Sequence, residues 1–523
     1  MTQPLRTSPA AAITRSISVC LALPLLSLLL PGCQSWHKTH ESALTAWASG
    51  NTDVSVARLQ EARSQFRSEK ELLDLDLAML ELAVGQPAAA ETLFRKKRES
   101  LDFLRQKDIG EQTASILTDS RAIAWSGRDF ERSMLLNLAM LSSMVSDGQD
   151  SFAYSLQFTK AAADRRELIA AALQKKQKDG KQTDSKLVDS KLVDQHSPEA
   201  ADDTTGIARV SYSSENPAVA ITASPVDQPL AFGAWLTALV QSETPSRAVE
   251  TEQALADVNF WNPAFADSPG AKKLTTGLGV RSRRGHGTLA VIALCGHAPQ
   301  WTAERVEPTS TALLIADRIL SATGKHTLPP TISSVKIARP CSTPSLRKTD
   351  WIRSDVTANS GSSPQKLSFH RLVDLHAVAE ASYNASRDDE IAAAIVRRIT
   401  KKGVVYALKS TSGVHRNTLV DLGVNAAGVA WEALEKPDTR SWRTLPGAID
   451  VATVELPAEP HTLSLASTSF SGRYPDPPRK INVNIEDGRN TWIVVMIPDQ
   501  AMAGHILVGG ADYQRLPVNP PAP

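Results

Sequence analysis

The residues of this chain that could do covalent chemistry are its cysteines, four among 523 residues. A thiol can be acylated, pair in a disulfide or act as a nucleophile. Cys20 lies inside an apolar run near the start, and Cys33 directly follows that run, whereas Cys295 and Cys341 each end a predicted strand. Those two could form a disulfide between adjoining strand ends or remain unpaired, and both alternatives stay open. A catalytic thiol is not favoured, because the sequence places no histidine as its partner.

Histidines, glycines and serines do not fall at spacings that indicate an enzyme site. His370 and His376 are six residues apart on a predicted helix, so they face different sides, whereas shared metal ligands on a helix need i, i+3 or i, i+4. Glycines at 277, 279, 285 and 287 lack the spacing of a phosphate-binding loop. No acylating-serine motif occurs. We therefore predict no catalytic residues, no metal and no cofactor.

Two polar clusters could contact a ligand or a partner. The first contains Arg284 and His286, in an arginine-rich turn before a predicted strand, and its alternative is a solvated turn. The second runs from Asp438 to Pro446 and contains Arg440 and Trp442. An arginine and a tryptophan can stack on a ligand, but a structural junction between helices and strands is the favoured alternative for this segment. Both interpretations are kept for each cluster.

The N-terminal segment has the composition of an export leader. Arg6 and Arg15 precede an apolar run over residues 17–30, and Pro31, Gly32 and Cys33 follow it. The run is too short for a spanning helix, which needs roughly 20 apolar residues. The alternatives are an ordinary secretory signal with an incidental cysteine, or an uncleaved membrane anchor. We expect residues 1–32 to be a signal peptide.

The ending Leu30-Pro31-Gly32-Cys33 resembles the lipobox of bacterial lipoproteins, in which the cysteine is lipidated and becomes the new N-terminus. Pro31 occupies a position where Ala or Ser is usual. The resemblance implies a lipid bilayer as partner through acylated Cys33. Because Gln34 and not Asp follows the cysteine, it also implies the outer membrane, with the protein facing the periplasm. Several acyl chains would make such attachment practically permanent.

The composition predicts a globular protein that does not bind nucleic acid. Hydrophobic residues make up 42% and charged residues 22% of the chain. The formal charge is +1, and it becomes −1 without the two arginines of the leader. A nearly neutral body offers no global field for nucleic acid or for an anionic membrane.

The fold expected is multidomain α+β, beginning with a helical half. Residues 33–178 show apolar positions at helical spacing, with breaks at Gly50, Gly85, Gly127 and Gly148. The first two breaks are 35 residues apart, close to a tetratricopeptide repeat, but the later spacings do not keep that period. We expect a degenerate tetratricopeptide-like array, with an irregular helical bundle as the alternative.

A polar insertion and a further helix pair complete this half. Residues 179–226 are predicted to be a disordered linker, because they are rich in Ser, Thr, Asp and Lys and repeat Ser-Lys-Leu-Val-Asp at 185–189 and 190–194. Residues 227–265 are predicted to add one more helix pair.

The second half is predicted to be mixed. Residues 275–437 form a mixed α/β region with helices over Phe369–Tyr383, Asp388–Leu408 and Leu419–Leu434. Residues 438–515 form a small C-terminal β-sandwich-like tail of five short strands, at 449–456, 462–466, 480–485, 492–497 and 505–508.

Three segments of the chain are similar to an uncharacterised family of bacterial envelope lipoproteins. They are Trp125 to Arg132 with Asn137, Gly287 to Val291 with Gly296 to Pro299, and Asp438 to Pro446. The chain departs from the family in its tandem linker and in Leu138, Met140 and Leu141, where tyrosines are usual. The family supplies no catalytic residues to transfer. The resemblance implies a cell-wall context, because members occur near lipoproteins that activate penicillin-binding proteins.

These observations lead to two functional hypotheses. The first is a membrane-anchored lipoprotein whose helical array binds an envelope protein and acts as a scaffold without catalysis, since stacked helix pairs create extended surfaces. The second is an envelope enzyme or a glycan-binding protein with its site in residues 275–515. It requires a pocket lined by Arg440, Trp442 or His286.

Overall fold

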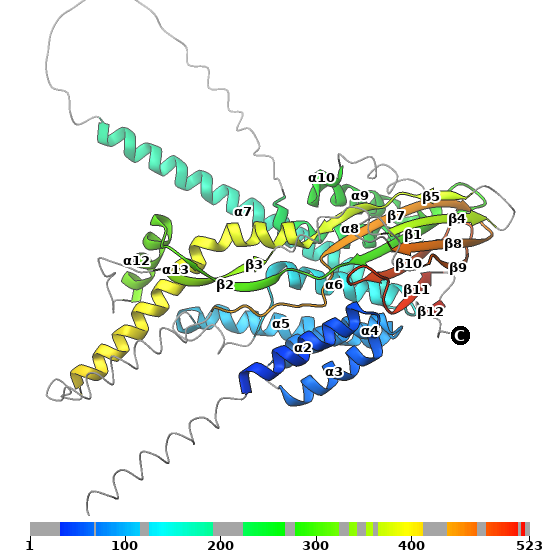
Figure 1. Cartoon of the computed structure of the whole chain (residues 1–523). Coiled ribbons are helices and arrows are strands. Elements are labelled where there is room, and N and C mark those ends of the chain that lie inside the picture. The colour runs from blue at the N-terminus through cyan, green and yellow to red at the C-terminus, as the bar shows by residue number, and fades with distance from the viewer. Residues whose placement is uncertain are drawn as a thin grey trace, which may run out of the picture.

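The computed structural model describes residues 32–66, 69–115, 125–191, 223–266, 278–323, 334–341, 352–358, 364–411, 437–467, 477–510 and 514–517. Helices dominate the first half of the chain and sheets the second (Figure 1). The predicted α+β class is therefore confirmed.

Helices of the first half follow one another as hairpins. They are α2 (Gly32–Ala48), α3 (Thr52–Gln65), α4 (Lys70–Ala83), α5 (Pro87–Ser115), α6 (Asp129–Met144) and α7 (Ser151–Lys191). Each packs on the next where the structure describes both. Gly50, Gly85 and Gly148 end α2, α4 and α6 with φ of 84°, 78° and 72°. Only glycine adopts this left-handed conformation without strain, so these three predicted breaks lie at helix ends. The fourth, Gly127, lies two residues before α6 with φ of 74°.

The predicted linker begins later than expected. Helix α7 continues to Lys191, although the sequence predicted disorder from residue 179. Residues 179–191 contain no proline and several lysines, which favour helix, so polarity alone did not predict a break. Residues 192–222 of the predicted linker lie outside the described residues.

A further helix pair follows the insertion, as predicted. It consists of α8 (Pro229–Gln241) and α9 (Ala248–Trp261), with short helices η3 (Pro225–Asp227), η4 (Pro245–Arg247) and α10 (Pro263–Ala266) beside them. Helix α8 is buried along its whole length and packs against α6, α7 and α9.

A six-stranded sheet lies beside these helices (Figure 1). Its order is β12-β11-β10-β1-β7-β6, and β1 (His286–Cys295) is central. β1 runs parallel to β10 (Asn490–Ile497) and antiparallel to β7 (Ala448–Pro457). The outer strands are β6 (His370–Asp374), β11 (His505–Gly510) and β12 (Gln514–Pro517). The short helix η5 (Gly279–Arg281) precedes β1.

The two faces of β1 contact different layers. Ala290, Ile292 and Leu294 join the core formed with the helices, whereas Leu289 and Val291 join a second core. That second core lies against a four-stranded sheet of order β5-β4-β8-β9. Its strands are β4 (Ile352–Ala358), β5 (Gln365–Leu367), β8 (Pro460–Ser467) and β9 (Arg479–Asn484). The architecture is therefore helices, sheet and sheet in three layers.

The predicted C-terminal tail does not form a sandwich by itself. Its five strands occur close to the predicted positions, as β7 to β11. However, β7 and β10 flank β1, and β8 pairs with β4. The sandwich therefore includes strands from both sides of the predicted boundary at residue 438.

The helix predicted at Phe369–Tyr383 is wrong in its first part. His370–Asp374 is strand β6, paired with β7, and α13 (Leu375–Thr411) then runs without a break through the predicted Asp388–Leu408 helix. Beside α13 lie α12 (Ser310–Thr323) and a ribbon of β2 (Gln300–Val306) and β3 (Val335–Cys341). The predicted Leu419–Leu434 helix lies outside the described residues.

One hydrophobic core extends through both halves of the chain. It joins side chains from helices and sheet, including Leu75, Trp235, Ile292, Val378 and Trp492. The predicted domain boundaries near residues 265 and 438 therefore do not divide the core.

Candidate functional site

The described residues form a groove on the helical half. Its volume is 580 Å³, and α5, α6, α7 and the start of α8 line it. The floor is apolar and consists of buried side chains: Leu101, Leu135, Leu136, Phe158 and Leu230. Leu168 lies at the rim, where 58% of it is exposed. Leu168 is therefore the most exposed leucine of the lining, while the floor leucines are almost completely covered.

Charged side chains surround this floor in balanced number. Four are basic, namely Arg98, Arg132, Lys160 and Arg165, and four are acidic, namely Asp102, Asp129, Asp164 and Asp227. Most form ion pairs, such as Lys160 with Asp164 at 2.8 Å along α7 and Arg132 with Asp129 along α6. A neutral rim over an apolar floor suits a protein segment with apolar anchors better than a highly charged polymer.

The wall formed by α7 is fixed to neighbouring elements. Arg165 pairs with buried Asp227 of η3 at 2.6 Å. Arg166 pairs with Asp257 of α9 at 2.6 Å, and its guanidinium lies 4.6 Å from the centre of the Phe260 ring. These contacts hold α7 beside α8 and α9, so the shape of the groove is built into the fold.

Arg440 and Trp442 lie inside the molecule and do not line the groove. Trp442 is fully buried, its amide N donates to Glu131 Oε1 at 2.9 Å, and its indole donates to Thr444 Oγ1 at 3.0 Å. Arg440 is 7% exposed and pairs with Asp438 at 2.7 Å. Of the two alternatives predicted for this segment, the structure therefore has the junction between helices and strands and not a contact for an external ligand.

The same segment reaches the first helices. Thr444 donates through its backbone N and its Oγ1 to Asp76 Oδ1 of α4, at 2.9 and 2.8 Å. His40 Nε2 of α2 lies 2.6 Å from Asp76 Oδ2, and both side chains are buried. The segment 437–447, here called the junction segment, is therefore tied to α2, α4 and α6.

Electrostatics in the junction follow from burial. Burial raises the pKa of the Glu131 carboxyl, and the positive charge of Arg128 opposes that shift. Arg128 also donates to the carbonyl of Arg440 at 3.0 Å, and its guanidinium lies 3.5 Å from the centre of the Trp301 ring. Each charged group here has an internal partner, which fits a structural role.

The turn with Arg284 and His286 lies on the surface. Arg284 is exposed, and His286, the first residue of β1, is half-buried with its Nδ1 3.3 Å from the Arg284 carbonyl oxygen. Neighbouring Arg283 pairs with Glu455 at 3.0 Å. The structure brings neither Arg284 nor His286 to the groove.

Cys295 and Cys341 are free thiols. Cys295 is buried at the end of β1, whereas Cys341 is exposed at the end of β3 in a different sheet. Of the two alternatives that the sequence left open, the structure has the unpaired one. Burial raises the pKa of the Cys295 thiol, which disfavours the nucleophilic thiolate. Cys33 lies in the first turn of α2.

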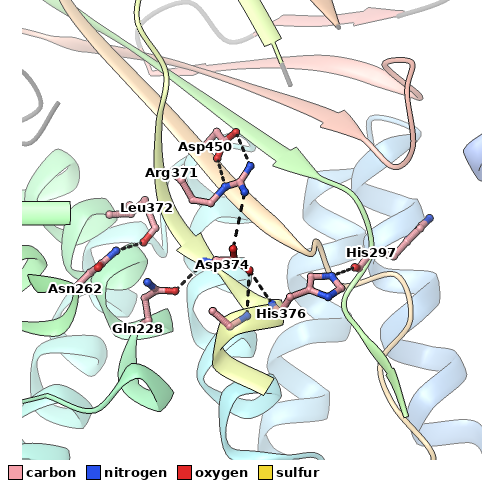
Figure 2. Close-up of polar contacts among 9 residues, drawn as sticks. Gln228, Asn262, His297, Arg371, Leu372, Asp374, His376 and Asp450 are labelled. Atoms are coloured by element: carbon pink, nitrogen blue, oxygen red, sulfur yellow. Dashed lines mark hydrogen bonds and ion pairs between the residues drawn. The ribbon is translucent and has the colours of Figure 1, made fainter. Parts of the chain in front are cut away.

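A second polar cluster lies where β6 meets α13 (Figure 2). Arg371 pairs with Asp450 on the neighbouring strand, Nε to Oδ1, at 3.0 Å. Asp374 accepts hydrogen bonds from the amides of His376 and Ala377 at 3.0 and 3.2 Å, so it caps α13. These are a cross-strand pair and a helix cap.

The remaining contacts of this cluster join it to its surroundings. Gln228 Oε1 accepts from the amide of Asp374 at 2.8 Å, and Asn262 Nδ2 donates to the Leu372 carbonyl at 2.8 Å (Figure 2). His376 Nε2 lies 3.0 Å from the His297 carbonyl oxygen, and burial lowers the pKa of both histidines. His370 is on β6 and His376 on α13, so they lie on different elements. Within the described ranges, no group of three or more His, Cys, Asp or Glu residues could hold a metal.

The sequence did not reveal the groove. Its lining residues lie between Arg98 and Leu230 on separate helices and form no motif. The available signal was Leu168, an apolar residue among the charges of Asp164, Arg165, Arg166 and Glu167 on α7. In the part of the chain that the structure describes, no helix is long and apolar enough to cross a bilayer. Comparison of the chain with protein-family models, curated proteins and solved structures gave no match.

Proposed function

We propose that this protein is a lipid-anchored interaction component of the bacterial cell envelope, whose helical half binds a protein partner in the groove. The observation that carries the proposal is the apolar floor of that groove, bordered by Leu168 and by balanced charges. No catalytic step is part of this function.

The helical half is proposed to be a degenerate tetratricopeptide-like array. Three hairpins, α2–α3, α4–α5 and α6–α7, turn at left-handed glycines, and α8–α9 adds a fourth. Stacked helix pairs of this kind present extended surfaces whose side chains can vary without loss of the fold. The array is degenerate because its turns are irregularly spaced.

The anchor is proposed to be acylated Cys33. The lipobox-like ending supports acylation, and Gln34 supports the outer membrane with the body facing the periplasm. The partner is then an envelope protein, and the resemblance given above supports one related to cell-wall synthesis. Replacement C33A should abolish incorporation of labelled palmitate, and label that persisted would contradict the anchor.

Two alanines on α7 offer a matched test of the groove. Ala161 lines it, whereas Ala163 is exposed but does not line it. Side chains two positions apart on a helix differ by about 200° in direction, so Ala161 and Ala163 point to nearly opposite sides. A photoreactive phenylalanine analogue at position 161 should cross-link the partner in cells, and the same analogue at 163 should not.

The substitutions A161W and A163W complete this test. A tryptophan at 161 should fill the groove and remove cross-linking from a probe at Gln157, which also lines it. A tryptophan at 163 should leave that cross-linking unchanged. Equal cross-linking in both variants would contradict partner binding in the groove.

The alternative hypothesis of an enzyme or glycan-binding protein in residues 275–515 has little to support it among the described residues. Arg440 and Trp442 have internal partners, and His286 lies in a surface turn. No specific observation therefore favours this second function.

A further inference from the structure

Helix α2 connects the proposed lipid site to the hydrophobic core without an intervening loop. The helix begins at Gly32, one residue before Cys33, and continues to Ala48. His40 is 1% exposed, Ala43 is fully buried and Trp47 is 2% exposed. Seven residues separate Cys33 from His40, which corresponds to about 10 Å of helix. The folded body therefore begins within two helical turns of the cysteine.

Helix α3 runs antiparallel to α2 and reaches the same end of the molecule. Ser55 Oγ donates to the Ala43 carbonyl at 2.7 Å, and Arg58 donates to the Ser42 carbonyl at 2.8 Å. Continued along the hairpin, this register brings the end of α3, at Ser64 to Phe66, level with the first turn of α2. Figure 1 shows the start of α2 beside the end of α3, far from β9.

These dimensions fit direct contact with a membrane. The polar region on each side of a bilayer is about 5–8 Å thick, from a total of about 40–45 Å and a hydrocarbon core of about 30 Å. A cysteine whose acyl chains enter the hydrocarbon thus lies among the headgroups. A helical stem of about 10 Å, of which the headgroups take about 5–8 Å, leaves only about 2–5 Å between headgroups and body.

We propose that the end face formed by the start of α2 and the end of α3 rests on the bilayer surface, with α2 as a rigid stem. This inference rests on the proposed acylation of Cys33. A flexible tether would allow the body to move far from the membrane, whereas a helical stem keeps the body at the membrane surface. The protein that occupies the groove is then one embedded in or attached to the same membrane.

The test measures the distance of two positions from the bilayer in the lipidated full-length protein, reconstituted into vesicles that contain nickel-chelating lipid. Spin labels are placed by S64C or by N482C, each with C341S, because Cys341 is the exposed free thiol. Ser64 lies near the end of α3, and Asn482 is exposed on β9. Nickel at the headgroups should accelerate relaxation of the label at 64 and leave the label at 482 unaffected.

A linker insertion supplies the control. About 12 Gly and Ser residues after Gln34 would add a flexible tether of roughly 20 Å, so the effect at position 64 should be lost while acylation persists. Equal relaxation at 64 and 482 in a protein whose acylation mass spectrometry confirms would overturn this inference but not the anchor. An unacylated Cys33 would overturn both.

Discussion

Asp76 is a buried side chain of the first helices that holds the junction segment. It is fully buried and accepts from His40 and from both donors of Thr444. D76N keeps the shape and an oxygen for the two Thr444 donors, but it removes the negative charge and puts an NH2 group in place of the oxygen that faces His40 Nε2. Breaking such a buried arrangement costs about 3 kcal/mol or more. We expect the urea midpoint to fall accordingly, measured by circular dichroism.

The control for this replacement is D499N, since Asp499 is exposed in the loop after β10. Surface changes of that kind alter the free energy of unfolding by no more than about 0.5 kcal/mol. If D76N were as mild as D499N, the buried network would not contribute to stability in the way its geometry indicates.

His297 should make the protein less stable in acid. Burial, with the charge of Arg443 second, lowers its pKa from 6.5 to about 4. Between pH 6.5 and about pH 4, the His297 ring therefore binds a proton in the unfolded chain but not in the folded chain. The stability that neutral His297 contributes is fully present above pH 6.5 and is lost as the pH falls toward 4. The ring lies against Trp47 and near His40 and Asp76.

H297Q removes this proton-binding site. Between pH 7 and pH 4.5, the wild type should lose about 2 kcal/mol more of its free energy of unfolding than the variant does. Urea titrations of both proteins at the two pH values give the comparison. Parallel pH profiles would show that the His297 ring is not responsible.

At the scale of elements, Gly233 allows α8 to approach α6 and α7. A methyl group there would overlap the Phe158 ring and Asn137 Oδ1. Helix propensity alone predicts that G233A stabilises by about 0.5–1 kcal/mol. Overpacking costs about 1–3 kcal/mol, so we expect a net loss in thermal or urea stability.

The sign of the change distinguishes the two effects. In an F158A background the ring is absent, so the same alanine should cost less than it does in the wild type. A stabilising G233A would mean that α8 can shift without penalty and that the close packing is not required.

Elements defined by local signals were predictable from the sequence, whereas those defined by distant partners were not. Gly50, Gly85 and Gly148 ended helices because a left-handed glycine is a local requirement. The sequence of β6 predicted a helix because Leu372, Val373 and nearby apolar residues also fit helical spacing. Its strand conformation depends on pairing with β7, which lies far along the chain. The groove depends likewise on helices brought together only by folding.

At the scale of the whole molecule, the junction segment decides whether helices and sheets are separate units. The sequence placed a boundary at residue 438, and Asp438 to Pro446 suggested either a ligand site or a junction. Neither alternative could be chosen from sequence, because Glu131 and Asp76, which bind Trp442 and Thr444, lie more than 300 residues earlier. The single core predicts that both halves unfold together.

A substitution at Trp442 tests whether the helices and the sheets unfold together. Its ring is fully buried and lies 5.9 Å from the Phe94 ring of α5, while its backbone binds Glu131 of α6 and the chain continues into β7. W442A should lower the free energy of unfolding by about 3–5 kcal/mol, against a small effect of V249A at an exposed site on α9. Because one core joins the layers, hydrogen exchange should accelerate together in α4, α6, β1 and β7. If hydrogen exchange became faster in the helices but stayed unchanged in β1 and β7, the helices and the sheets would be separate domains. The predicted domain boundary at residue 438 would then be correct.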